Sequence, residues 1–119
     1  WWTTYSTRSS SVPVDIYDGA TRIDTVSVDQ KVNGGQWNVL GAYTFAGQPK
    51  VVVRAEGSES TCADAIKFTH SDGTERIIDN GASGTSSTGT WKVSGGAGYY
   101  GTNSVFSREG TTYTFASGL

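Results

Sequence analysis

Several residue types are scarce in this 119-residue sequence, and each scarcity excludes a class of protein. The chain has no Met, two Pro, one His and one Cys. A single cysteine cannot form a disulfide within the chain, and one Cys with one His cannot complete a zinc site. Charged residues make up 17% and the net charge is −2, so the chain has no excess of basic residues for nucleic acid. No apolar run approaches the roughly 18 residues of a membrane span, and we expect no membrane insertion.

What the sequence has in abundance is small polar and aromatic residues. Ser and Thr supply 31 residues, Gly 16, and Trp, Tyr and Phe together 14. Helix-favouring Ala, Leu, Glu and Lys are scarce, which argues against a helical bundle, and the aromatic content argues against disorder. The composition is typical of an extracellular or cell-surface protein. Because the sequence starts at Trp1 and not at Met, we expect it to be a piece of a longer protein.

Apolar and polar residues alternate along most of the chain, which is the pattern of β-strands. Residues 12–16 form one such run, and Asp18-Gly19 ends it as a turn. Asn33-Gly34-Gly35 predicts a hairpin turn between strands over 26–32 and 37–45. Further short strands are predicted at 51–53, 66–68, 77–78, 91–93 and 113–115. This spacing predicts an all-β fold, an antiparallel β-sandwich of jelly-roll type, with a closed barrel as the alternative.

The segment from Asp79 to Asn103 is rich in Gly, Ser and Thr. It also carries aromatic residues, which a solvated linker does not need, so we expect an ordered glycine-rich loop that packs on the sandwich. Residues 96–101 match the spacing G-x-G-x-x-G. A dinucleotide site needs a strand before that motif and a helix after it, and no helical pattern follows here. We therefore interpret the motif as a turn-rich loop and expect no cofactor.

The candidate catalytic and metal-binding residues all have simpler interpretations. His70 stands beside the turn Ser71-Asp72-Gly73, and no G-x-S-x-G elbow supplies a nucleophile, so we expect a solvated histidine. Asp15 and Asp18 are the closest carboxylate pair in a strand region, but their odd and even positions face opposite sides. A structural calcium ion is conceivable, yet no D-x-D-x-D-G spacing is present, and we expect no metal. Cys62 lies in an apolar run and is expected to be a small buried side chain, with an intermolecular disulfide as the alternative.

The aromatic residues are the best candidates for a contact surface. Trp1-Trp2 and Tyr99-Tyr100 are adjacent pairs, so one member of each pair is expected in the core and the other outside it. Outward rings can stack on sugars or anchor another protein. We expect Trp37 and Trp91 in the core. The candidate binding or assembly surface comprises Trp1, Trp2, Tyr5, Tyr99 and Tyr100.

Two stretches of the sequence together resemble a known family. Asn33-Gly34-Gly35-Gln36-Trp37-Asn38-Val39-Leu40-Gly41 with Ala63-Asp64-Ala65-Ile66-Lys67-Phe68 resembles the second half of a golvesin-type domain. This module is also described as the xanthan lyase carbohydrate-binding-like domain. Ile78-Asp79-Asn80, Thr90-Trp91 and residues 98–103 resemble its first half. The resemblance implies an extracellular β-sandwich module with no catalytic residues, appended to secreted hydrolases and lyases and associated with saccharide binding.

The two halves stand in swapped order, with the second-half segment at 1–70 and the first-half segment at 77–119. We therefore predict either one permuted β-sandwich unit over 1–119 or one period of a tandem repeat. A sandwich divided in this way leaves unpaired strand edges and an open core, which strand exchange can close. The predicted function is a non-catalytic extracellular structural or adhesion module that self-associates into a fibre or surface array, its partners being copies of itself or adjacent repeats. The alternative is a carbohydrate-binding module of a larger secreted enzyme or adhesin, with polysaccharide as the partner.

Overall fold

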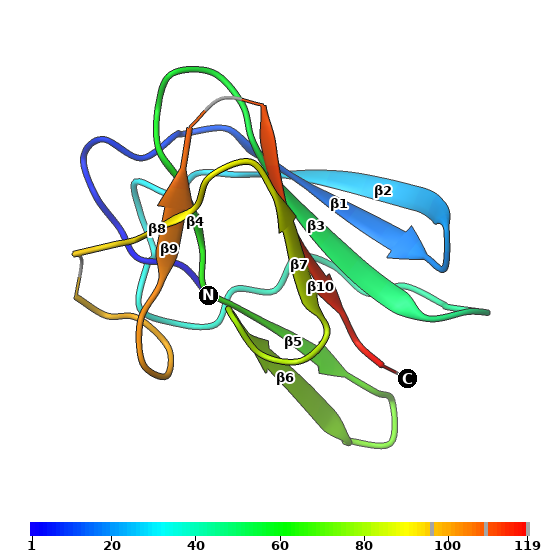
Figure 1. Ribbon diagram of the computed structural model, residues 1–119. Coiled ribbons are helices and arrows are strands. Elements are labelled where there is room, and N and C mark those ends of the chain that lie inside the picture. Colours follow the sequence, from blue (N-terminus) through cyan, green and yellow to red (C-terminus); the bar gives the residue numbers. More distant parts are fainter. Residues whose placement is uncertain (96, 109, 119) are drawn as a thin grey trace.

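Figure 1 shows the computed structural model of the chain, in which residues 1–95, 97–108 and 110–118 are described. The described residues form ten strands and no helix, so none of them forms a helix that could cross a membrane. In chain order the strands are β1 (Val12–Asp18), β2 (Thr21–Val28), β3 (Pro49–Ala55), β4 (Thr61–Ala63), β5 (Ala65–Thr69), β6 (Glu75–Asp79), β7 (Thr85–Thr88), β8 (Lys92–Val93), β9 (Val105–Ser107) and β10 (Thr111–Ala116).

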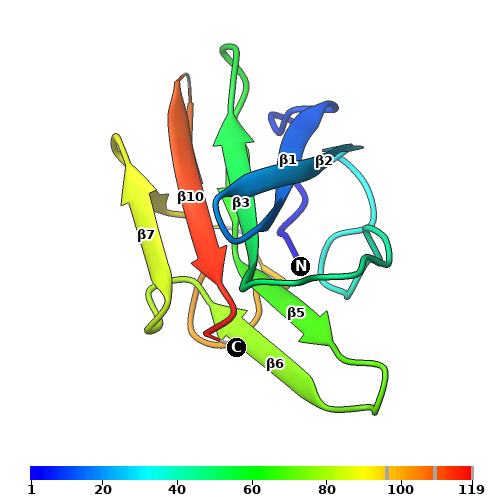
Figure 2. The ribbon, with the colours of Figure 1, turned by 90° about the vertical axis from the view of Figure 1, so that its right-hand side faces the viewer.

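The strands form one large sheet and two small ones, and every strand pair is antiparallel. The large sheet has the order β2-β1-β3-β10-β7, and the small sheets are β4-β9-β8 and β5-β6. The β5–β6 hairpin lies at one end of the large sheet, across its strands (Figure 2). Residues of both small sheets contribute to the hydrophobic core. The antiparallel all-β sandwich predicted from the sequence is therefore confirmed. β3 pairs with β10 and β4 with β9, so the segments 1–70 and 77–119 of this chain share sheets.

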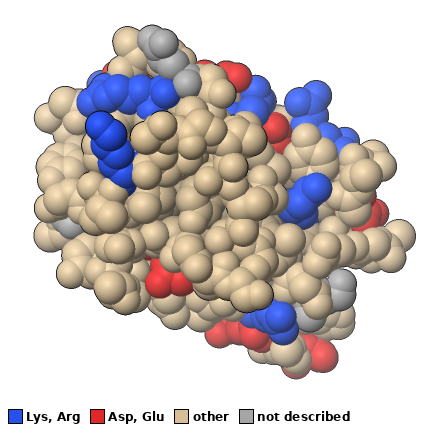
Figure 3. Space-filling model, in the orientation of Figure 1, with Lys and Arg blue, Asp and Glu red and all other residues tan. Residues whose placement is uncertain are grey.

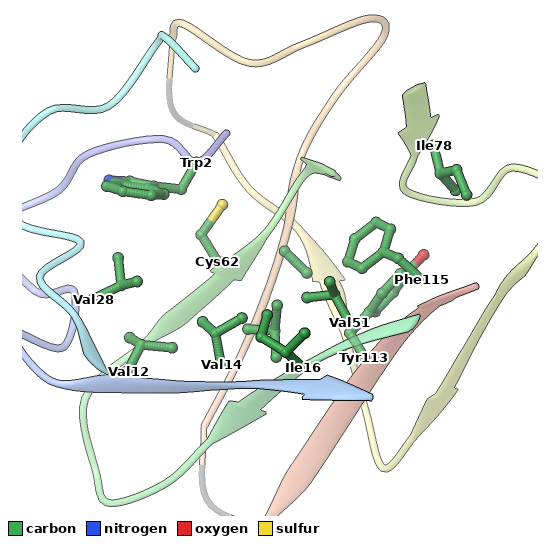
Figure 4. Close-up of a cluster of buried hydrophobic side chains, with 12 residues drawn as sticks. Trp2, Val12, Val14, Ile16, Val28, Val51, Cys62, Ile78, Tyr113 and Phe115 are labelled. Atoms are coloured by element: carbon green, nitrogen blue, oxygen red, sulfur yellow. The ribbon is translucent and has the colours of Figure 1, made fainter. Parts of the chain in front are cut away.

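The core follows from the alternation in β1. Val12, Val14 and Ile16 point to the same side and are nearly inaccessible to solvent. Figure 4 shows them on the same side of β1 as Cys62 of β4 and Phe115 of β10. Burying these apolar side chains away from water is the main stabilising contribution to the fold. Cys62 is a free, buried thiol, as expected for a small apolar side chain.

The opposite face of β1 carries a charged pair. Asp15 is buried there and accepts a hydrogen bond from Thr25 Oγ1 (2.7 Å). Its carboxylate also pairs with Arg54 Nε on β3 (2.8 Å). Asp18, at the end of β1, accepts hydrogen bonds from the main-chain nitrogens of Ala46 and Gly47. The two carboxylates thus have separate structural partners and do not form a pair.

The β5–β6 hairpin forms as the sequence predicts. The turn Ser71-Asp72-Gly73 joins the strands, and Gly73 has a φ of 91°, which a side chain would disfavour. His70 lies exposed beside this turn, with its Nδ1 3.3 Å from the Asp72 carboxylate. This geometry is that of a solvated turn residue.

The predicted strand over residues 37–45 is wrong. Asn33 and Gly35 do adopt positive φ (58° and 70°), but the chain does not fold back along β2. The turn instead docks on the N-terminal residues, because Gly35 N donates to Trp2 O (2.9 Å) and Gly34 lies so close to Thr4 that a Cβ would overlap it. Residues 37–45 consequently cross the end of the sandwich as irregular chain.

The glycine-rich segment is ordered where it is described, as predicted. β7 extends the large sheet by pairing with β10. Trp91 packs against the core: its indole nitrogen donates to Thr112 O (3.2 Å) and its ring meets Tyr113 edge-on at 5.3 Å. Gly96, the first residue of the G-x-G-x-x-G match, lies outside the described residues, and no helix follows that match in the described chain.

Candidate assembly site

A large cavity lies between the sheets. Its volume is about 900 Å³, and most of its lining residues are apolar. Side chains of β1, β3 and β10 form one wall, and β5 with residues 37–45 form the others; the lining includes Val14, Ile16, Val51, Phe115, Ile66, Phe68, Leu40, Tyr43 and Phe45. The cavity is open to solvent along part of its boundary, so a further segment of chain could enter it.

One edge of β5 borders this cavity and has free main-chain groups. Asn80 N donates to Asp64 O (2.6 Å), which sets the register of the β5–β6 ladder. Alternate residues of an antiparallel ladder turn their amides outward, so the main-chain groups of Lys67 and Thr69 point away from β6. Among the described residues these groups have no main-chain partner, whereas Ala65 O accepts a hydrogen bond from the main-chain nitrogen of Trp1 (3.0 Å). The β5 edge can therefore accept one more strand beyond Trp1.

Three aromatic rings from distant parts of the sequence meet at the rim of the cavity. The centroid of Trp37 lies 5.2 Å from those of both Trp1 and Tyr100, and the centroids of Trp1 and Tyr100 are 5.5 Å apart. The ammonium group of Lys67 stands over the Trp37 ring at 4.8 Å. We call Trp1, Trp37, Tyr100 and Lys67 the aromatic rim. Its contacts are tilted and edge-on, so the rings support one another more than they offer one flat platform.

The irregular wall at 37–45 does not show the alternating burial that a strand would have. Leu40, Tyr43 and Phe45 are partly buried against the core, while Val39 is 94% exposed. Tyr43 OH donates to Asp24 Oδ2 (2.7 Å), which ties the wall to β2. This hydrogen bond to the carboxylate is the main reason that the pKa of Tyr43 is raised. The wall is thus held by this hydrogen bond, by the contacts of Trp37 in the aromatic rim and by the packing of Leu40 and Phe45 on the core.

The residues predicted as a contact surface lie in three places. Trp1 and Tyr100 belong to the aromatic rim, and Tyr99 is exposed next to it. Trp2 is buried, with its indole nitrogen donating to Val32 O (2.9 Å). Tyr5 lies on the other side of residues 1–8, with its ring 5.0 Å from the guanidinium carbon of Arg8. Of the first adjacent pair, Trp2 lies in the core and Trp1 does not, as expected, and Trp2 is therefore no part of an exposed surface. The second pair differs from the prediction, because Tyr99 is exposed and Tyr100 is half-buried on the rim, so neither lies in the core.

Sequence reasoning missed several residues. Trp37 was expected in the core but lies on the rim, because the turn at 33–35 directs it there. Arg8 is fully buried, and its guanidinium donates to Thr3 O (3.1 Å) and Ser60 Oγ (3.1 Å). A second, smaller pocket of about 240 Å³ lies beside Arg8 and Tyr5. The residue type alone predicts exposure for Arg, so no signal in the sequence pointed to this burial.

Asp64, at the junction of β4 and β5, is the most perturbed carboxyl group. Burial raises its pKa to about 7; the hydrogen bond from Tyr100 N (2.9 Å) opposes this shift, and the nearby Asp79 adds to it. Burial also raises the pKa of Asp79. The described residues include no group of three or more His, Cys, Asp or Glu side chains that could hold a metal ion.

The molecular surface near the site has no strong charge of one sign. On the face in Figure 3, the Lys and Arg side chains are scattered among Asp and Glu, and most of the surface is uncharged. Recognition on that face would depend on apolar and main-chain contacts more than on long-range electrostatics.

Comparison with known proteins gives one match. Residues 1–70 match the sequence model of the Golvesin C-terminal domain, a family associated with secreted proteins. No curated protein and no solved structure matches this chain. The matched region covers more than half of the chain and contains β1 to β5, residues 37–45 and three members of the aromatic rim, Trp1, Trp37 and Lys67. This chain belongs to the Golvesin C-terminal domain family.

Proposed function

We propose that this domain is a non-catalytic extracellular structural module that assembles by accepting a β-strand from another copy or an adjacent unit. The observation that carries the proposal is the free main-chain edge of β5 beside an apolar cavity of about 900 Å³. A donated strand would pair with the amides and carbonyls of Lys67 and Thr69. Its inward side chains would fill the hollow between the sheets.

The energetics favour a strand over a small ligand. An exposed strand edge combined with unfilled apolar volume leaves both hydrogen bonds and dispersion contacts unmade. A strand is the one occupant that meets both needs, because its backbone pairs with β5 while alternate side chains enter the cavity. The partly buried residues of the wall, Leu40, Tyr43 and Phe45, would close over it.

The geometry of such exchange also determines the assembly. When the donated strand and the accepting edge are different surfaces, the contact is heterologous and head-to-tail. Heterologous contacts extend into filaments or arrays unless the rotation happens to close a ring. A tandem chain would meet the same need by donating a strand between adjacent repeats.

A proline substitution at Thr69 tests the proposal. The amide of Thr69 points away from β6, so Thr69→Pro removes a donor from the free edge without breaking the β5–β6 ladder. We expect the wild-type chain to form oligomers or filaments in light scattering coupled to size exclusion and in electron microscopy. Thr69→Pro is expected to shift this equilibrium to the monomer, whereas Thr69→Ala, which keeps the amide, assembles as the wild type does. A wild-type chain that is monomeric at all concentrations would refute the proposal.

The non-catalytic part of the proposal has its own support. His70 is exposed, and its Nδ1 lies 3.3 Å from the Asp72 carboxylate and the same distance from Asp72 N. A nucleophile–histidine pair needs a hydroxyl or thiol within hydrogen-bond reach of the imidazole. His70→Ala is therefore expected to leave assembly and stability unchanged.

Saccharide binding is a second candidate, favoured by the aromatic rim. Tyr99 is 44% exposed beside Trp1, Trp37 and Tyr100, and a sugar ring could stack on it. Glycan-array screening with Tyr99→Ala as the matched variant separates the two functions. Binding that Tyr99→Ala abolishes while assembly persists would assign the rim to saccharides, and no binding to any glycan would remove this candidate.

A further inference from the structure

The main-chain nitrogen of Trp1 occupies the position of a strand amide at the β5 edge. It donates a hydrogen bond to the main-chain oxygen of Ala65 (3.0 Å), the first residue of β5. Figures 1 and 2 both place this end of the chain beside the start of β5. Ala65 has the same parity as Lys67 and Thr69, so this bond belongs to the row of main-chain groups that point away from β6. Trp1 N therefore makes the first contact of a ladder that the described residues do not continue.

The residues after Trp1 determine the direction of this ladder. The main-chain nitrogen of Thr3 donates to Cys62 Sγ (3.4 Å), so the partner number falls from 65 to 62 as the chain advances from Trp1 to Thr3. Residues 1–3 thus run antiparallel to residues 62–65. A polypeptide joined to the Trp1 nitrogen and continuing along the same line would pass first Lys67 and then Thr69.

The side chains around Trp1 show which way an incoming strand would face. Directly opposite residues of an antiparallel pair lie on the same face, so Trp1, opposite Ala65, shares a face with Lys67. Both indeed contact the ring of Trp37, the Trp1 centroid at 5.2 Å and Lys67 Nζ at 4.8 Å. Trp2, the next residue along the chain, is buried in the core. The strand alternation is therefore already established at residues 1 and 2.

The same alternation extends to residues joined to the Trp1 nitrogen. Counting back from Trp1, the first and third residues would stand opposite Ile66 and Phe68, whose side chains pack against the core and line the cavity. The second and fourth would stand opposite Lys67 and Thr69 and pair with their main-chain groups. A strand with apolar side chains at the first and third positions would both complete the ladder and fill the cavity.

The electrostatics at the Trp1 nitrogen favour a peptide bond there. Burial lowers the pKa of this ammonium group, and the nearby Asp64 carboxyl opposes the shift. Among the described residues, the ammonium has one hydrogen-bond acceptor, Ala65 O. A peptide N–H would donate the same hydrogen bond without burying a charge. The site therefore suits a strand that continues through Trp1 better than a free amino group.

We propose that the strand accepted by β5 is joined to the Trp1 nitrogen, runs antiparallel to β5 and carries apolar side chains at the first and third positions before Trp1. This inference rests on the proposed function and specifies its donor as the adjacent unit on the N-terminal side. The covalent link gives the strand a high effective concentration at the β5 edge, which a separate copy lacks. A chain that carries this strand would have no free β5 edge to offer to other copies.

Two N-terminal extensions of equal composition test the direction and register. The first places (Gln-Val)₃ directly before Trp1, so that Val stands at the first, third and fifth positions; the second places (Val-Gln)₃ there and reverses the faces. In dilute solution, we expect (Gln-Val)₃ to slow amide hydrogen exchange at Lys67 and Thr69 at least about tenfold relative to the unextended chain. The (Val-Gln)₃ extension would direct Gln side chains into the apolar cavity and is expected to leave both amides unprotected.

The unextended chain separates this inference from the proposed function. Light scattering is expected to show that (Gln-Val)₃ chains stay monomeric at concentrations at which unextended and (Val-Gln)₃ chains assemble. The inference is overturned if (Gln-Val)₃ leaves Lys67 and Thr69 unprotected in a chain that urea unfolding shows to be folded, or if both extensions protect them equally. Assembly of the unextended chain would then still support strand acceptance from another source.

An unextended chain that is monomeric at all concentrations refutes the proposed assembly instead. Protection of Lys67 and Thr69 by (Gln-Val)₃ and not by (Val-Gln)₃ would, even in that case, support a strand that enters through Trp1.

Discussion

Asp64→Asn is the substitution with the most specific expected consequence. In the folded chain, burial raises the pKa of Asp64 from its ordinary value of 3.8 to about 7. One pKa unit corresponds to about 1.4 kcal/mol, so ionising Asp64 costs about 4 kcal/mol more in the folded state than in the unfolded state. This is a large fraction of the total stability of a domain, which is typically about 5–15 kcal/mol.

The direction in which the free energy of unfolding changes with pH follows from proton binding. Between pH 4 and 7, the folded state retains a proton on Asp64 that the unfolded state has already lost. The free energy of unfolding therefore falls as pH rises through this window and levels off above it. Asparagine carries no charge at any of these pH values, so the variant lacks this decline. Asp79 is present in both proteins, and its charge is one of the causes of the raised pKa of Asp64, so the difference between the proteins includes this interaction.

Urea unfolding followed by tryptophan fluorescence, in EDTA and at several pH values from about 4 to 8, measures the difference directly. We expect the stability of Asp64→Asn relative to wild type to rise by about 4 kcal/mol across this range. The new amide also has a fixed cost, because its NH₂ has no acceptor at the Oδ1 position, but this cost does not vary with pH. Asp72→Asn is the control of opposite sign, since hydrogen bonds from Thr74 lower the pKa of Asp72. A difference between Asp64→Asn and wild type that is independent of pH would refute the reasoning.

Two further substitutions test the packing around the cavity and the packing of Gly101 against Asp79. Phe115→Ala empties a fully buried position on β10 and is expected to cost about 3–5 kcal/mol in urea unfolding; a loss below about 1 kcal/mol would mean that the wall of the cavity is not a packed core. Gly101→Ala places a Cβ against Asp79 Oδ2 at a φ of 64°, and it is expected to cost about 2 kcal/mol or more in the same assay. Unchanged stability of Gly101→Ala would show that the loop at 100–103 is not packed against Asp79.

The sequence predicted strands with neighbouring partners, such as β1, β5 and β6, and also β3 and β10, whose partners lie far along the chain; it did not predict which distant strands pair. β1 and the β5–β6 hairpin have strict alternation and a glycine turn, so local chemistry decides them. Residues 37–45 have equally good alternation but form no strand. The conformation of these residues depends on the contact between the turn at 33–35 and residues 2–4. No local sequence pattern predicts this contact.

The candidate sites also depend on contacts between distant parts of the chain, which the sequence does not predict. Composition pointed to Trp1 and Tyr100 as contact residues, and the structure brings them together, but it adds Trp37 and Lys67 from a different part of the chain. The environment of Asp64 brings together three segments that are far apart in the sequence, those of Asp64, Asp79 and Tyr100, and no local motif predicts it. Only the pairing of β4, β5 and β6 and the path of the loop at 98–103 create it.

Hydrogen exchange at the amides of Lys67 and Thr69 tests the central claim most directly. These groups face the cavity and have no main-chain partner within the described part of the chain. If a strand from another copy occupies the β5 edge, both amides will exchange slowly at high protein concentration and rapidly on dilution, while Ile66 and Phe68 stay protected throughout. Rapid exchange of Lys67 and Thr69 at every concentration would contradict the claim that this edge accepts a strand from another copy.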